Sequence, residues 1–194
     1  MFSVSTKGRL LLATPPLEDP NFDRTVVYML EHHDEGAIGV VINRPTEDAL
    51  EAPLDRWIDL QSAPSTIFAG GPVETMAMVA LGRPVASVDP NASTAEGESE
   101  VFTAITTDVV SVDLTADPAI AGADVSSVRV FRGYAGWGEQ QLDAELDAGA
   151  WMILDGNADD VFSDRPEELW RTVLARQPGR LSWLADAPDD LSLN

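Results

Sequence analysis

Short hydrophobic segments, separated by glycine, proline and acidic residues, follow one another through the first half of this chain. Residues 8–14 (GRLLLAT), 24–31 (RTVVYMLE) and 37–43 (AIGVVIN) are rich in aliphatic and β-branched residues, a composition that favours strands. The last two segments are apolar on both faces, which predicts buried central strands. The five-residue connection HHDEG between them contains Gly36 and predicts an antiparallel hairpin.

The strand pattern continues through the middle of the chain. Four further strands are predicted, the first of them running into a turn at two glycines: 65–74, 75–83, 101–107 and 125–131. The periodicity of 75–83 also fits a helix, but the segment is short and ends at Gly82 and Pro84, which favours a strand. Residues 87–100 (SVDPNASTAEGESE) contain almost nothing that a core would bury. This segment therefore predicts a mobile acidic loop on the surface.

Helical spacing of apolar residues appears early in one place and twice near the end of the chain. Leu54, Trp57 and Ile58 share one face of a predicted short helix over 53–61. A second helix is predicted over 139–148, directly after a glycine-rich stretch.

The last predicted helix has its own start signal. Asp164 is followed three residues later by Glu167, the spacing of a capping box, and an apolar stripe then runs to about Gly179. From about residue 186 we expect a frayed tail. The predicted strands come first, the helices come mostly late, and the connections have the length of hairpins. This order predicts an α+β fold with a mixed, largely antiparallel sheet. No linker divides residues 1–194, so we expect a single domain.

Composition narrows the classes of protein to consider. The chain has no cysteine, which excludes disulfides, zinc–thiolate sites and a thiol nucleophile. The N-terminal apolar run is too short for a signal peptide, and no segment approaches the ~20 apolar residues of a membrane helix. We therefore expect a cytoplasmic protein that does not bind membranes.

Charge argues against direct binding of nucleic acid. The chain has 12 basic and 33 acidic residues, a formal net charge of −21. Phosphate contacts supply most non-specific affinity for DNA, and here the eleven arginines and the single Lys7 are scattered along the sequence. We expect no direct DNA binding and instead a well-solvated acidic surface.

No sequence motif for catalysis, cofactor or metal binding emerges. Gly133, Gly136 and Gly138 have the spacing G-x-x-G-x-G rather than that of a dinucleotide loop, and Glu139 places an anion where a phosphate would bind. A tight corner covered by aromatic residues is the favoured interpretation of this stretch. Neighbouring histidines in a strand point to opposite faces, which argues against a shared metal ion in EHHDEG.

Four blocks of sequence together resemble the YqgE/AlgH family of bacterial proteins. They are residues 8–45, 68–74 (FAGGPVE), 130–153 (VFRGYAGWGEQQLDAELDAGAWMI) and 161–174 (VFSDRPEELWRTVL), in this order. The resemblance covers roughly residues 6–184. It departs from the family pattern at Gln140, where glycine is usual, and in the acidic loop 87–100.

The resemblance implies a bent sheet that closes into a pseudo-barrel flanked by helices, and it implies no catalytic residues. Family members are often labelled as transcriptional regulators. Ten positions that match the family motifs are candidates for a shared binding surface: His32, Asn43, Arg44, Gly70, Gly71, Pro72, Tyr134, Trp137, Gln141 and Glu145.

Most of these candidates also have a purely structural interpretation. The glycines and Pro72 would be needed by a tight turn in any case, and Trp137 is the kind of residue that a core contains. Arg44 follows a buried strand, and the favoured interpretation is an ion pair with Glu145 that locks the corner helix to the hairpin. The alternative is that Arg44 binds a carboxylate or phosphate of a ligand.

Three functions follow, in order of preference. The first is a non-enzymatic regulatory protein that acts through contacts with an unidentified protein partner. The second is a small-ligand binder or enzyme, with a pocket between the strand exit at 43–45 and the corner at 133–141. The third is direct DNA binding, which the charge disfavours.

Overall fold

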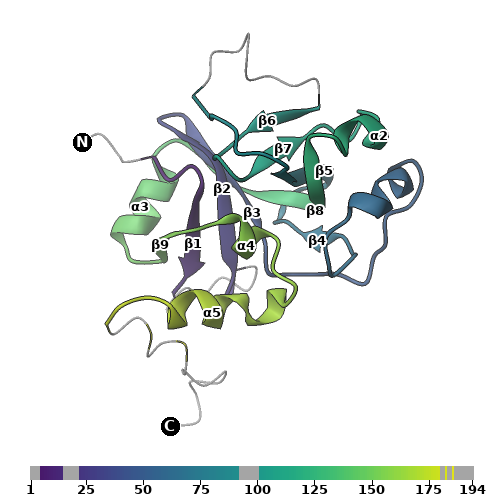
Figure 1. Ribbon diagram of the computed structural model, residues 1–194. Helices are drawn as coiled ribbons and strands as arrows, with labels where there is room; N and C mark the ends of the chain where they lie inside the picture. The colour runs from purple at the N-terminus through teal and green to yellow at the C-terminus, as the bar shows by residue number, and fades with distance from the viewer. Residues whose placement is uncertain (1–4, 15–21, 92–100, 180–181, 183–184, 186–194) are drawn as a thin grey trace.

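The computed structural model describes residues 5–14, 22–91, 101–179, 182 and 185, and its dominant feature is one curled, mostly antiparallel sheet (Figure 1). The strand order is β6-β7-β5-β8-β3-β2-β1-β9, and β4 pairs in parallel with β8. The strands are β1 (Arg9–Ala13), β2 (Val26–His33), β3 (Gly36–Val41), β4 (Phe68–Ala69), β5 (Val73–Pro84), β6 (Phe102–Ala104), β7 (Val110–Val112), β8 (Val125–Trp137) and β9 (Trp151–Asp155).

Short helical segments flank the half-barrel that this sheet forms, so the predicted α+β class is confirmed. They are η1 (Leu54–Leu60), α2 (Pro118–Ala121), α3 (Gln141–Asp147), α4 (Ala158–Val161), η2 (Pro166–Glu168) and α5 (Leu169–Ala175), where η marks a 3-10 helix. Among the described residues, no helix has the length and apolar character that crossing a membrane requires.

The 13-residue strand β8 joins the two halves of the sheet. Its first part pairs with β5, and its end pairs with β3 through Ala37 and Trp137. Side chains of β8 enter all three hydrophobic clusters, with Phe131 in one, Val130 in the second and Trp137 in the third. The two halves therefore share one central element.

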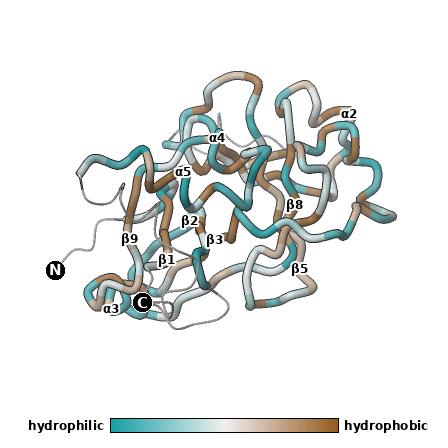
Figure 2. The backbone as a smooth tube through the Cα atoms, turned by 90° about the horizontal axis from the view of Figure 1, so that it is seen from below, coloured by the Kyte–Doolittle hydropathy of each residue, from teal (hydrophilic) through white to brown (hydrophobic). Residues whose placement is uncertain are grey.

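Alternation along β1 explains how both faces of the sheet are buried. Leu10 and Leu12 pack in the cluster that contains Trp170 of α5, whereas Leu11 packs on the opposite face with Trp151. Figure 2 shows that β1 and β9 are predominantly hydrophobic. Each fully buried leucine stabilises the fold by about 1.5–3 kcal/mol relative to an exposed one.

The hairpin of β2 and β3 is confirmed, but its connection is shorter than the sequence predicted. Both histidines belong to β2, and His33 pairs with Gly36, which leaves Asp34 and Glu35 as a two-residue turn. Gly36 is the first residue of β3 and has a φ of 146°, a conformation that favours glycine. A Cβ at this position would also overlap the carbonyl oxygen of Trp137.

The predicted helix over 53–61 forms as the 3-10 helix η1, and this changes which face is apolar. With three residues per turn, positions spaced by three share a face. Trp57 is buried, but Ile58 is 51% exposed and does not join it, contrary to the prediction.

The glycine-rich corner lies later than predicted. β8 continues through Gly133 and Gly136 as far as Trp137, and α3 follows after a short turn that contains Gln140 in a left-handed conformation (φ 58°). β8 does not turn at Gly133 (φ 71°), because this residue lies opposite the bulge of β5 at residues 74–77 and β8 pairs with β5 again at Tyr134.

The predicted capping box of the last helix is also wrong. Pro166 begins η2, and neither η2 nor α5 has a side-chain cap. A capping box does form at α4, between Asn157 and Asp160. The apolar stripe along α5 is confirmed, because Leu169, Trp170, Val173 and Leu174 are all buried.

Four elements without a sequence prediction complete the fold: β7, α2, β9 and α4. The expected loop 87–100 lies outside the described residues from position 92 onward, as does the expected tail from 186, and residues 87–91 form neither helix nor strand.

Candidate functional site

The ten candidate residues lie in four separate places along the sheet. His32 is at one end of the β2–β3 hairpin, where its Nδ1 accepts hydrogen bonds from the Thr6 amide (3.3 Å) and hydroxyl (3.1 Å). Its side chain is buried, while His33 is exposed, so the prediction of opposite faces is confirmed.

Asn43 and Arg44 lie at the other end of the hairpin and bind backbone. The Asn43 side chain accepts from the Val26 amide and donates to the Arg24 carbonyl, both at 2.9 Å, and so takes the place of a backbone pair at the start of β2. Arg44 donates to the Asp23 carbonyl at 2.9 Å. The favoured ion pair between Arg44 and Glu145 is therefore wrong, because each side chain is engaged elsewhere; a ligand at Arg44 stays a prediction.

Gly70, Gly71 and Pro72 pass so close to β8 that two of them must be glycine. A Cβ on Gly70 would lie 2.3 Å from the Gly133 carbonyl oxygen, and one on Gly71 would lie 2.2 Å from the Tyr134 carbonyl carbon. Gly71 also has a φ of 149°. Pro72 is exposed and Tyr134 is half-buried beside this crossing.

Glu145 holds the remaining candidates together on the side of α3. One of its carboxylate oxygens accepts from Trp137 Nε1 at 2.9 Å and from Trp151 Nε1 at 2.8 Å; the other accepts from Gln141 at 2.9 Å. The two indole rings are edge to face at 5.9 Å. This arrangement fastens α3 to β8 and β9 and gives Trp137, which is buried, the core role expected of it.

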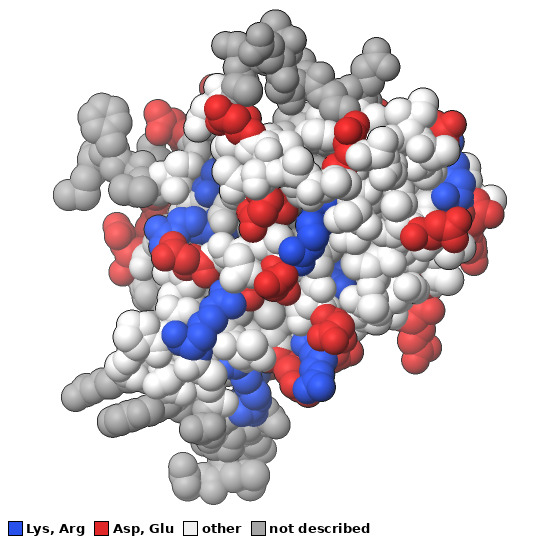
Figure 3. All heavy atoms as spheres, in the orientation of Figure 1, with Lys and Arg blue, Asp and Glu red and all other residues white. Residues whose placement is uncertain are grey.

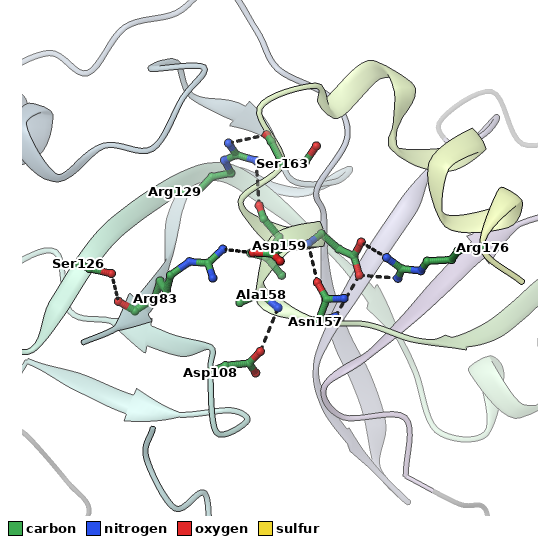
Figure 4. A network of polar contacts seen from close by, with 11 residues as sticks. Arg83, Asp108, Ser126, Arg129, Asn157, Ala158, Asp159, Ser163 and Arg176 are labelled. Atoms are coloured by element: carbon green, nitrogen blue, oxygen red, sulfur yellow. Dashed lines mark hydrogen bonds and ion pairs between the residues drawn. The ribbon is translucent and has the colours of Figure 1, made fainter. Parts of the chain in front are cut away.

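A polar network that the sequence did not reveal surrounds α4 (Figure 4). Arg83 pairs with Asp159 at 2.8 Å, and Arg176 forms a two-pronged pair with Asp160, both contacts at 2.6 Å. The hydrogen bonds that Arg176 donates to Asp160 raise the pKa of Arg176. These contacts fix a four-residue helix that has too few backbone bonds to be stable alone.

Arg129 binds the end of α4 and the residue that follows its C-cap, and it is 1% exposed. It donates to the carbonyls of Val161 (2.8 Å), Ser163 (3.0 Å) and Ala63, and to the Ser62 hydroxyl (3.2 Å). Burial lowers its pKa to about 10, so it stays charged at neutral pH. The sequence does contain a signal for this buried role, because Arg129 is a charged residue inside the apolar run VRVF at 128–131.

A second buried polar chain starts at Tyr28, which is 1% exposed. Its hydroxyl lies 3.4 Å from that of Thr106, which donates to Asp108 at 2.8 Å; Asp108 in turn accepts from the Ala158 amide at 3.1 Å. Burial is the main cause that raises the pKa of Tyr28 to about 12.

Tyr28 should make the fold sensitive to strong alkali. The unfolded tyrosine loses its proton near pH 10 but the folded one near pH 12, so its stabilisation is present below pH 10 and declines as the pH rises to 12. The difference between these two pKa values corresponds to about 3 kcal/mol in the free energy of unfolding. Urea unfolding across this range should show a smaller decline for Tyr28→Phe than for the wild type. Parallel declines of the two proteins would contradict the assignment.

An open apolar groove lies beside β5 and β7. Two cavities of about 590 and 430 Å³ share Pro53, Leu54 and Met78 in their walls. Val112 lines the first cavity and Ile67 the second. We call the region formed by these five residues the methionine groove.

Met76, which lines neither cavity, adds exposed apolar surface two residues before Met78 on β5. It is 85% exposed, and Met78 is 38% exposed. Residues 74–77 stand out from the sheet because Val73 pairs with Tyr134 and Met78 with Arg132, so only Gly133 faces them. The sequence pattern predicted this strand but gave no sign that it presents methionines to solvent.

Charged groups on the face that carries α4 and α5 alternate in sign (Figure 3). Besides the pairs at α4, Arg9 pairs with Asp155 at 2.8 Å and Arg165 lies 3.7 Å from Glu168. Within the described parts of the chain, no three histidine or acidic side chains lie close enough to hold a metal ion.

Comparison with known proteins gives consistent matches over almost the whole chain. Residues 10–182 match the family model described as AlgH-like. A UPF0301 protein of Streptomyces avermitilis is 45% identical over 190 residues, which cover 98% of this chain and 96% of the relative. A UPF0301 protein of Mycobacterium tuberculosis is 41% identical over 187 residues, covering 96% and 90%.

Two solved structures share the fold. The crystal structure of protein DIP2367 from Corynebacterium diphtheriae has a TM-score of 0.82 and 26% identity, covering 96% of this chain and 94% of that one. The solution structure of the AlgH protein from Pseudomonas aeruginosa has a TM-score of 0.65 and 28% identity, covering 98% of each chain.

Proposed function

The chain belongs to the AlgH-like family, and we propose that it is a regulatory protein that binds another protein through the methionine groove and does not act as an enzyme. The observation that carries this proposal is the exposed apolar surface of Met76 and Met78 beside an open groove. Exposed apolar patches mark interaction sites, and methionine side chains adapt to varied partners.

The polar side chains of the other candidate places favour this role over ligand binding or catalysis. Arg44 binds the Asp23 carbonyl, and the Glu145 carboxylate is occupied by two tryptophans and a glutamine. A ligand between these two places would have to displace or share the hydrogen bonds that both side chains already make.

Direct nucleic-acid binding receives no support from the charge arrangement. The arginines around α4 and α5 pair with carboxylates, so they present little net positive potential to a phosphate backbone. We therefore place regulation in protein contacts, in the cytoplasmic setting that the sequence suggests.

Selection of peptides from a random display library on the immobilised full-length protein tests the proposal. We expect enriched peptides whose affinity falls about tenfold or more with Met78→Glu, because the charge enters the apolar centre of the contact. Met78→Ala, which only shortens the side chain, is a milder second variant. Val85→Glu is the matched control, since Val85 is 61% exposed and lies outside the groove.

Circular dichroism and melting temperature establish that each variant is folded. Enriched peptides that bind Val85→Glu as the wild type does, but bind both Met78 variants less tightly, support the proposal. No enrichment, or peptides that bind Met78→Glu and Met78→Ala as tightly as the wild type, would overturn it.

A further inference from the structure

Two carboxylates line the cavities of the methionine groove without a cationic partner. Glu51 belongs to the smaller cavity and Asp113 to the larger one, and both residues are exposed. No Lys, Arg or His of the described chain comes within ion-pair distance of either one. Asp113 accepts hydrogen bonds from the Thr115 amide and hydroxyl, at 2.8 and 2.7 Å, which hold it in place.

The two arginines of the groove are already engaged. Arg132 pairs with Asp48 at 2.9 Å, which cancels one positive and one negative charge. Arg56 donates to the carbonyls of Leu114 and Thr115 at 2.9 and 3.0 Å. Arg56 keeps its positive charge, but these carbonyls hold its guanidinium against the wall of the larger cavity. The carboxylates of Glu51 and Asp113 are the lining anions that no cation of the described chain neutralises by an ion pair.

The apolar part of the groove lies between these carboxylates. Pro53, Leu54 and Met78 form part of both cavities, whereas Glu51 lines only one of them and Asp113 only the other. The order of features along the groove is thus acidic, apolar, acidic. A complementary segment would carry positive, aliphatic and positive side chains in turn.

We propose that the groove binds a basic segment of another protein, with an aliphatic side chain over Leu54 and Met78 and a lysine or arginine toward each of Glu51 and Asp113. This inference rests on the function proposed above and adds the chemistry of the partner. The net charge of −21 also attracts a basic segment at long range.

The same charges argue against a second copy of this chain as the occupant. Two copies would bring net charges of −21 together and place acidic groove walls against an acidic surface. Such like-charge contacts oppose association. The occupant is therefore a different protein.

Binding of short labelled peptides to the full-length protein tests the inference. Three peptides share a leucine-rich centre and differ only in flanking residues, which are lysine, glutamine or glutamate. We expect the lysine peptide to bind most tightly. Glu51→Gln combined with Asp113→Asn should weaken it about three- to tenfold, the range for two solvent-exposed ion pairs.

The matched control is Glu139→Gln combined with Asp147→Asn, which changes the net charge by the same amount at exposed positions outside the groove. We expect it to change the affinity less than twofold, because distant exposed charges are screened. Weakening by the groove pair alone supports the inference.

Other outcomes separate this inference from the proposed function. Equal weakening by both double variants would overturn the inference, since the attraction would then be diffuse. Tighter binding of the glutamine or glutamate peptide, lost with Met78→Glu, would also overturn it but leave the proposed function intact. If no peptide binds in a manner sensitive to Met78→Glu or Met78→Ala, both fail.

Discussion

Replacing Arg129 by methionine should lower the free energy of unfolding by about 3–5 kcal/mol, the range for breaking a buried charged network. The carbonyls of Ala63, Val161 and Ser163 would lose their donor, and the carbonyl of Val161 is fully buried. Methionine has a similar length, so the loss reports on hydrogen bonds more than on a cavity. Urea unfolding followed by tryptophan fluorescence measures the change.

Arg83→Met is the control for this substitution. The Arg83 guanidinium also lies over an aromatic ring, at 5.1 Å from Phe162, compared with 4.3 Å between Arg129 and Phe68. Arg83 pairs with Asp159, but both side chains are partly or largely exposed, so its loss should cost only about 0–1 kcal/mol. Similar losses for the two variants would show that burial of Arg129 is not what makes it important.

Gly71→Ala should destabilise the protein by about 3 kcal/mol or more, because the new Cβ would overlap backbone that has no room to move. The nearest atoms are the carbonyl carbon and oxygen of Tyr134, at 2.2 and 2.3 Å, in the middle of β8. Thermal unfolding by calorimetry measures the loss, with the heat of unfolding as a check that the variant is folded.

Gly149→Ala separates overlap from backbone strain. Gly149 also has a positive φ, of 74°, but no atom lies within 4 Å of its added Cβ. The expected cost is therefore only that of the left-handed conformation, about 1–2 kcal/mol. If Gly71→Ala proved as mild as Gly149→Ala, the close crossing of residues 70–71 and β8 would not be a constraint on the fold.

The sequence predicted the elements whose signals are local. Apolar runs identified β1, β2, β3 and β5, and the stripe on α5 identified its buried face. It failed where the deciding contact comes from elsewhere in the chain. Gly133 seemed to end β8 because its partner in the bulge, residues 74–77, is distant in sequence.

The candidate residues show the same division. Asn43, Trp137 and Glu145 are all held by contacts within the chain. The sequence predicted the core role of Trp137, but it did not predict the partners of Asn43 and named the wrong partner for Glu145. The methionine groove was not predicted because its walls come from η1, β5 and β7. Surface exposure of a methionine depends on which neighbours cover it, and no local pattern records that.

Residues 74–77 of β5 form a short arch that makes no ladder pairs with β8 and carries the exposed Met76. Val73 pairs with Tyr134 and Met78 with Arg132 on the two sides of this arch. Substitutions at its exposed positions should therefore change the proposed binding surface while these two pairs stay in place. The arch is thus a suitable place to re-engineer binding preference.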